Sequence, residues 1–123
     1  MTVSIGTATR FRSGTEVMSR TEVTSGDPSL LPLVAARQAV AELVDHTRGP
    51  GWHVELREVA ALRLINSPAT GDLLTTRVQC TPAGSACEFV ATARCTCAGT
   101  PVANLTMRVA VLPDAVPTDW GQP

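Results

Sequence analysis

The side chains that could exchange protons with a substrate are concentrated in one short part of this sequence. Glu42, Asp45 and His46 follow one another near the end of a helix-forming stretch, and His53 comes shortly afterwards. Carboxylates and imidazoles are the usual general acids and bases of enzymes when they face a bound substrate. Glu42, His46 and His53 are therefore the candidates for catalysis in this chain.

The same residues also fit a structural role. Gln38, Glu42 and Asp45 would fall on one stripe of a helix, as the solvated edge of a surface helix does. His46 stands beside a Gly-Pro-Gly helix stop, where a partly charged imidazole complements the helix dipole. His53 lies in strand-like sequence of period two, which is typical of an edge residue. We favour this solvated role and expect no catalytic residue among them.

Four cysteines would allow a metal site, a disulfide framework or a set of small buried side chains. Cys80, Cys87, Cys95 and Cys97 all lie in strand-like sequence. Zinc sites favour a Cys-x2-Cys turn, and a disulfide framework would come with a secretory leader. Because the sequence has neither pattern, we expect buried thiols, no metal and no cofactor.

Composition and charge argue against several classes of partner. The chain has ten basic residues, all of them arginine, and eleven acidic ones, so its net charge is −1. This balance does not indicate a nucleic-acid partner. No stretch approaches the roughly 20 apolar residues of a membrane span, and the start has no apolar leader. We therefore expect a cytoplasmic protein that binds neither nucleic acid nor membrane.

The stretch from Asp27 to His46 predicts the one long helix that must position the polar groups. Asp27 or Ser29 can cap its first N–H groups, and Pro28 or Pro32 fits the first turn. The sequence Arg48-Gly49-Pro50-Gly51 ends it. Its apolar positions form a stripe broad enough to require cover from other elements: Leu33, Ala35, Ala36, Ala39, Val40, Ala41, Leu43 and Val44.

Most of the remaining sequence alternates with period two, which predicts strands. A kink is expected at Val59-Ala60-Ala61, where the rhythm breaks. The predicted strands cover residues 16–24, 52–65, 73–81, 86–97 and 101–112.

An antiparallel meander with one dry face and one wet face can wrap a single helix. We therefore predict an α+β fold in which a curled antiparallel sheet encloses one long buried helix. Residues 15–112 would form the single domain, residues 1–14 a strand or arm, and residues 113–123 a tail.

This order of elements resembles the hot-dog fold, and the residues are similar to those of the 3-hydroxyacyl-acyl-carrier-protein dehydratases. Residues 62–112 resemble the second half of those proteins, with Pro68 and Gly71-Asp72 in the turn before the last three strands. Upstream, TEVTSGDPSLLP resembles the strand that leads into the helix, and residues 32–42 are similar to the helix itself. The resemblance covers about residues 15 to 112.

The chain departs from that family at its catalytic motifs. The family's His loop has no counterpart between Asp27-Pro28 and Leu31-Pro32. Gln38 stands six residues after the proline, where the family has its helix acid. β-Elimination needs a base for the carbon proton and an acid for the leaving hydroxyl, and an amide can be neither. A carboxylate at Glu42 would lie one helical turn away, displaced by roughly 6 Å.

The resemblance implies a dehydratase-like subunit that acts on carrier-protein-bound 3-hydroxyacyl chains in polyketide or fatty-acid biosynthesis. Because the catalytic pair is missing, we expect a non-catalytic partner in a heterodimer with a second hot-dog subunit, rather than in a homodimer. An acyl carrier protein is the other expected partner. The substrate tunnel would be lined by Pro32, Leu33, Ala36, Gln38 and Val40.

Two alternatives remain open. The chain could be a self-sufficient hot-dog enzyme, either a dehydratase or isomerase or an acyl thioesterase, with relocated acid and base residues among Glu42, His46 and His53. It could also be an acyl-chain binding protein without chemistry. Turnover by the isolated chain would favour an enzyme, whereas activity that requires a second hot-dog protein would favour the helper.

Overall fold

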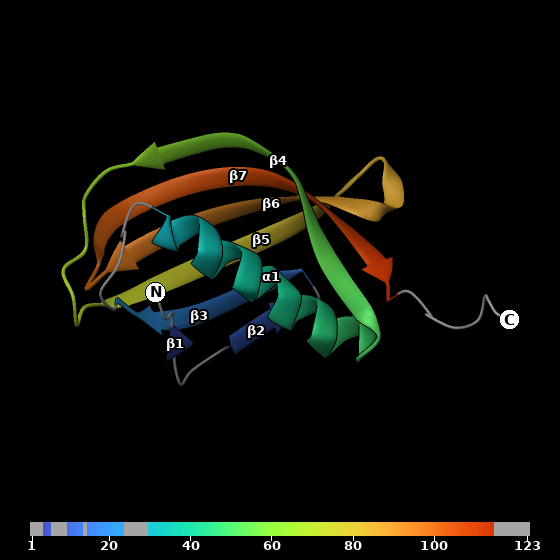
Figure 1. The fold of residues 1–123 in the computed structure, drawn as a ribbon, viewed down its shortest axis with the longest axis horizontal. Helices are drawn as coiled ribbons and strands as arrows, with labels where there is room; N and C mark the ends of the chain where they lie inside the picture. The colour runs from blue at the N-terminus through green and yellow to red at the C-terminus, as the bar shows by residue number, and fades with distance from the viewer. Residues whose placement is uncertain (1–3, 6–9, 14, 24–29, 115–123) are drawn as a thin grey trace, which may run out of the picture.

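A computed structural model of the chain shows one α-helix lying across the concave face of a curled sheet (Figure 1). It describes residues 4–5, 10–13, 15–23 and 30–114, and the statements below concern these ranges. The elements in chain order are β1 (Ser4–Ile5), β2 (Arg10–Ser13), β3 (Glu16–Glu22), α1 (Leu31–Arg48), β4 (Trp52–Leu64), β5 (Leu73–Ala83), β6 (Ser85–Cys97) and β7 (Thr100–Pro113).

The strands form one seven-stranded sheet with the order β1-β3-β5-β6-β7-β4, and β2 also pairs with β3. Every pairing is antiparallel. The last three strands form the predicted meander, while β4 pairs with β7 and closes the order at one end. Figure 1 shows the sheet curling around α1, so the predicted α+β architecture of a wrapped helix is confirmed.

The helix begins later than the sequence predicts, at Leu31 instead of Asp27. Pro32 occupies the first turn, where its missing N–H leaves no bond unmade. The predicted caps Asp27 and Ser29, together with Pro28, lie outside the described residues. The helix ends two residues later than predicted, at Arg48 instead of His46, and the chain leaves it at Gly49 of the predicted stop, whose φ is +79°.

The strand boundaries differ from the prediction mainly at the turns. The expected turn at residues 82–85 is tighter, since β5 continues to Ala83 and β6 begins at Ser85, with Gly84 between them at a φ of +95°. The predicted kink in β4 is confirmed, because its register with β7 shifts between Leu56 and Glu58 and again between Val59 and Ala61.

The described residues near both ends of the chain belong to strands. At the beginning, residues 4–5 and 10–13 form strands that pair with β3. At the other end β7 runs to Pro113, and the expected tail from residue 115 onward lies outside the described residues.

The core lies between the buried stripe of α1 and the concave face of the sheet. Ala35, Ala36 and Ala39 are at most 1% exposed, and their small side chains let the helix approach the strands closely. Strand residues of the concave face, among them Leu74 and Met107, are 0% exposed opposite them. Because the sheet covers this side only, the other side of α1 is left open.

The cysteine prediction is right for two residues and wrong for two. All four thiols are free; Cys80 and Cys95 are buried, whereas Cys87 and Cys97 are only partly buried. The latter lie toward the two ends of β6. In the described part of the chain, no three His, Cys, Asp or Glu side chains are grouped as metal ligands would be.

Candidate functional site

A groove of about 520 Å³ lies between the open side of α1 and the first half of β4. Its helix residues recur three and four positions apart, which places them on one face. Largely apolar hollows with a few polar groups are the usual form of small-molecule sites. The lining residues are Leu33, Val34, Arg37, Gln38 and Ala41 from α1, and Trp52, His53, Val54 and Leu56 from β4.

Gln38 and Arg37 are the polar side chains that the helix contributes to this groove, and both are exposed. The Gln38 amide can donate and accept hydrogen bonds, and the Arg37 guanidinium donates only and keeps its charge. None of the described residues that line the groove is a carboxylate. The helix wall can therefore orient a polar or anionic group, but it cannot exchange a proton.

His53 borders the groove, but the strand register directs its side chain to the other face of β4. It alternates with Trp52 and Val54, and its Nε2 lies 3.7 Å from Oε2 of Glu55, two residues along the same face. Its Nδ1 lies 3.1 Å from Oδ1 of Asp114. Two carboxylates thus accompany the imidazole, and all three side chains are between 44% and 57% exposed.

Glu42 and His46 lie one turn apart on α1. Glu42 is half-buried and His46 is exposed. Neither belongs to the lining of the groove. The structure therefore does not bring Glu42, His46 and His53 together around one hollow.

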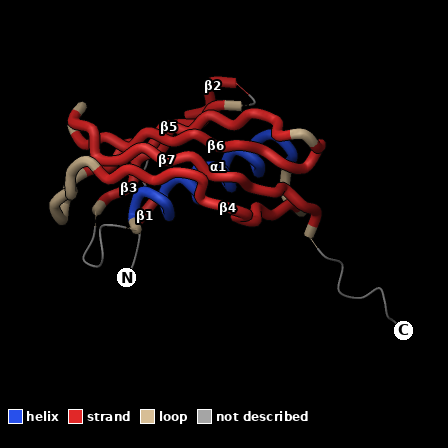
Figure 2. The backbone as a smooth tube through the Cα atoms, turned by 90° about the horizontal axis from the view of Figure 1, so that it is seen from above, coloured by secondary structure: helices blue, strands red, loops and turns tan. Residues whose placement is uncertain are grey.

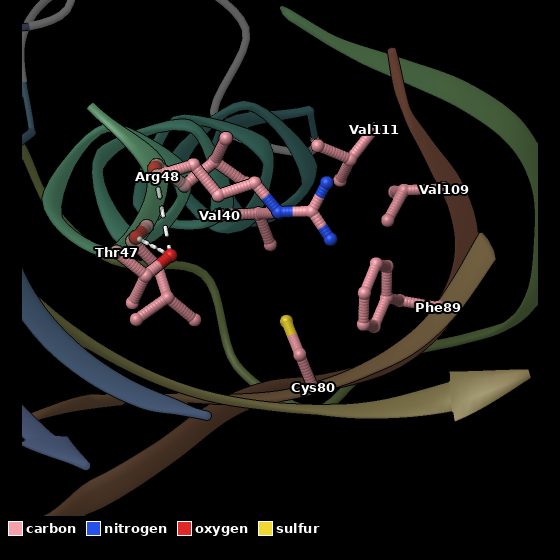
Figure 3. A pocket seen from close by; sticks show the side chains of 9 residues that line it. Val40, Thr47, Arg48, Cys80, Phe89, Val109 and Val111 are labelled. Atoms are coloured by element: carbon pink, nitrogen blue, oxygen red, sulfur yellow. Dashed lines mark hydrogen bonds between the residues drawn. The ribbon is translucent and has the colours of Figure 1, made fainter. Parts of the chain in front are cut away.

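A separate cavity of about 220 Å³ lies beneath the C-terminal end of α1, between the helix and the sheet (Figure 3). Figure 3 shows the Arg48 side chain extending over it and the Cys80 thiol at its floor. The lining residues are Val40, Leu43, Val44, Thr47, Arg48, Cys80, Phe89, Val109 and Val111.

The polar groups of this cavity are already engaged or neutral. The Arg48 guanidinium carbon lies 4.8 Å from the centroid of the Trp52 ring and 5.8 Å from that of Phe89, within the range of cation–π attraction. Thr47 Oγ1 donates to the Leu43 carbonyl at 2.9 Å. Burial raises the pKa of the Cys80 thiol to about 11, so this sulfur is not a thiolate at neutral pH. The cavity therefore offers apolar space and no nucleophile.

The predicted tunnel residues are divided between different surroundings. Leu33 and Gln38 line the groove, whereas Val40 lines the cavity. Pro32 and Ala36 are fully buried in the core and belong to neither lining. The predicted tunnel residues therefore do not line one common space: they are divided among the groove, the cavity and the core.

Sequence reasoning missed that Arg37 and Leu56 belong to the groove and that Arg48 spans the cavity. Period-two alternation places Trp52 and Leu56 on one face of a strand, but their position opposite α1 depends on the long-range pairing of β4 with β7. Arg48 could have been found from its place as the last helical residue, directly before a stop and an aromatic residue.

Solved structures share this fold at low sequence identity. The chain is similar to the fluoroacetyl-CoA thioesterase FlK, with a TM-score of 0.70 and 9% identity over 85% of this chain and 90% of that one. It is similar to a hot-dog-like protein from Thermanaerovibrio acidaminovorans, with a TM-score of 0.65 and 17% identity over 84% of both chains. The chain thus has the hot-dog fold.

A further similar structure is the dehydratase heterocomplex ApeI:P from Xenorhabdus doucetiae, with a TM-score of 0.68 and 12% identity over 86% of this chain and 80% of that one. Thioesterases and a dehydratase complex are therefore both represented among proteins of this shape.

No protein-family model matches the sequence, and no curated protein sequence matches it. Among the described residues, no helix combines the length and the hydropathy needed to cross a membrane.

Proposed function

We propose that this chain is a helper subunit of a 3-hydroxyacyl dehydratase of polyketide or fatty-acid biosynthesis. It shapes the acyl-binding groove and leaves proton transfer to a second hot-dog subunit. The observation that carries the proposal is the lining of the groove, where Gln38 and Arg37 supply hydrogen bonds and charge and none of the described lining residues is a carboxylate. Dehydration removes a proton from C2 and the hydroxyl, as water, from C3, so it needs a base and an acid.

An exposed apolar strip on β4 supports a protein partner. β4 stands at one end of the strand order, so one of its edges has no neighbouring strand among the described residues. Val59, Leu62, Leu64 and Ile65 are between 37% and 49% exposed along and just after it. An open sheet edge with apolar side chains favours association with another chain. In our proposal the partner is an unlike hot-dog subunit that carries the missing acid and base.

The groove residues then have distinct roles. The apolar side chains of Leu33, Val34 and Trp52 contact the acyl chain, and the Gln38 amide orients the thioester or hydroxyl by hydrogen bonds. The Arg37 guanidinium, exposed at the groove, suits the acidic surface of an acyl carrier protein.

The decisive experiment measures dehydration of a 3-hydroxyacyl carrier protein by the chain alone and after mixing with a catalytic hot-dog partner. Alone, the chain should be no faster than background, because each missing proton-transfer group is worth roughly 10²- to 10⁴-fold. In the mixture, mutating the partner's His or acid should abolish activity, while Glu42→Gln or His46→Ala here should leave most of it. Turnover by the isolated chain would contradict the proposal.

The Gln38→Glu variant provides a gain-of-function test, because it places a carboxylate at the groove position that lacks one. Gln38 is exposed, so this substitution should leave the free energy of unfolding within about 0.5 kcal/mol of the parent value. Mixed with a partner whose own acid has been removed, Gln38→Glu should restore part of the activity, whereas the parent chain should not. Equal activity of the two mixtures would show that position 38 does not face the substrate.

A second candidate function is acyl-thioester hydrolysis, favoured by the pairing of His53 with Asp114 on the outer face of β4, where His53 borders the groove. In this reaction water attacks the carbonyl carbon, the C–S bond breaks and the thiol leaves with a proton. An imidazole oriented by a carboxylate is a common means of activating water. If the isolated chain hydrolyses acyl-CoA and both His53→Ala and Asp114→Asn lower kcat by at least about 10²-fold, the thioesterase function replaces the helper.

A further inference from the structure

Three arginines form a row across the sheet face that points away from α1. Register pairs Arg77 on β5 with Arg94 on β6, Arg94 with Asn104 on β7, and Asn104 with Arg63 on β4. Residues paired in this way lie on the same face of a sheet, so the four side chains stand side by side. All four are exposed. In Figure 2 the strands that carry this arginine row lie next to one another, in front of the helix.

Without a bound ligand, the arginine row lowers the stability of the sheet. Arg77 and Arg94 are directly opposite each other, and like charges in that position destabilise a sheet. Among the described residues, neither Arg94 nor Arg63 forms an ion pair or a hydrogen bond through its side chain. Arg77 donates from Nη2 to the sulfur of Met18 at 3.7 Å. The row therefore concentrates positive charge without a matching carboxylate between Arg94 and Arg63.

A hollow of about 300 Å³ lies on the strands between Arg94 and Arg63. Its polar side chains are the two guanidiniums, the Asn104 amide and the hydroxyls of Thr92 and Thr106. Thr92 and Thr106 are themselves paired in register, next to the arginine row. All of these groups can donate hydrogen bonds, and none of the described residues that line the hollow is a carboxylate.

The spacing suits a compact anion. Arg94 and Arg63 are two strands apart, or about 10 Å, with Asn104 midway between them. Long side chains from both positions can therefore converge on one group above Asn104. Guanidinium forks match phosphate oxygens in a bidentate manner, which makes arginine the preferred residue for phosphate recognition.

We propose that this hollow binds a phosphate ester or pyrophosphate group. Arg94 and Arg63 contact its oxygens from two sides, Asn104, Thr92 and Thr106 add hydrogen bonds, and Arg77 extends the positive field along the row. A small phosphate-bearing molecule fits better than an acidic protein surface, because the donors converge on one hollow. The phosphates of a coenzyme A thioester and of a phosphopantetheine arm present the same chemistry. The inference does not depend on the helper function proposed above.

Titration calorimetry and amide chemical shifts at low ionic strength test the site with two probes, inorganic pyrophosphate and coenzyme A. Both should bind, with shifts at Thr92 and Asn104, and Arg94→Gln or Arg63→Gln should weaken binding at least tenfold. Arg108→Gln is the matched control, since Arg108 lies on the same face opposite Glu58 and outside the hollow, and it should change affinity less than twofold. Coenzyme A that binds more tightly than pyrophosphate identifies a nucleotide-type ligand; equal affinities identify the phosphate group as the determinant.

An independent readout comes from the unliganded protein. Arg94→Gln should raise the melting temperature in low salt and reduce its dependence on added salt, because the opposed charges are relieved. Binding of neither probe, or binding that survives the Arg94→Gln/Arg63→Gln double variant, overturns the proposal. So does an acidic carrier protein that binds this face while both phosphate probes fail. Because no assay here uses turnover, the outcome is separate from that of the dehydratase test.

Discussion

Replacing Val109 by Ile should stabilise the domain, because the added methyl group can enter the cavity beneath α1 without displacing a neighbour. Val109 is 1% exposed and lines the cavity of about 220 Å³. This volume is several times the roughly 30 Å³ that one water molecule takes up in the liquid. Burying one further methylene contributes about 0.8 kcal/mol. The expected gain in the free energy of unfolding is therefore about 0.8 kcal/mol, or about 3 °C in Tm.

Val78→Ile is the matched control. Val78 is 0% exposed, is also a valine in a strand, and lines none of the hollows described above. An extra methyl group in a filled core forces neighbours apart and costs about 1–3 kcal/mol. The same chemical change should therefore have opposite signs at the two positions and differ by about 2–4 kcal/mol.

Urea and thermal unfolding, followed by circular dichroism, measure both variants on the same scale. A common m-value would show that the variants unfold from comparably compact states. If Val109→Ile is destabilised as much as Val78→Ile, the space beneath α1 is filled in solution and the reasoning from cavity volume is wrong.

Ala36→Asp should abolish cooperative unfolding, because it places an unpaired carboxylate at a position that is 0% exposed, at a cost of several kcal/mol against a total stability of roughly 5–15. Val34→Asp, at a position 38% exposed, should fold, and a well-folded Ala36→Asp protein would refute the burial of the helix face that meets the sheet. A thiol reagent should label the partly buried Cys87 before Cys80 and Cys95 in native protein, and equal rates at all three would contradict their burial. Burial raises the pKa of Cys80 and of Cys95 from 9.0 to about 11, so the unfolded state binds fewer protons between pH 9 and 11. The free energy of unfolding should then fall over that range by up to about 1.4 kcal/mol per pH unit for each thiol, and a flat profile would count against the assignment.

The elements of this fold could be predicted because their signals are local. The helix stop is set by Gly49, and the strands by period-two alternation that matches the buried face of the sheet. The helix start was misplaced because Asp27 looks like a cap, whereas the described helix has Leu30 at its N-cap and Pro32 in the first turn. The periodicity of α1 alone does not show which of its residues line the groove and which line the cavity.

The candidate site was predicted less well because it depends on pairings between distant segments. β4 follows the helix in sequence but pairs with β7, and this pairing sets Trp52 and Leu56 opposite Gln38. The same register turns His53 toward Glu55 and Asp114. A sequence shows that His53 alternates with its neighbours, but it does not show which of the two faces will meet the helix.

The division of polar groups over the two faces of the sheet bears on both proposals. Inside, the groove beside α1 has hydrogen-bonding groups at Gln38 and Arg37 and apolar walls, which suits a bound acyl chain better than proton transfer. Outside, Arg94 and Arg63 stand unpaired among the described residues although opposing charges would stabilise the sheet. A protein selected only for stability would replace one of these arginines by an acid, because cross-strand pairs of opposite charge are favourable. In the two proposals both faces serve binding: the described lining of the groove, which has no carboxylate, holds an acyl chain, and the arginine row on the other face holds a phosphate group.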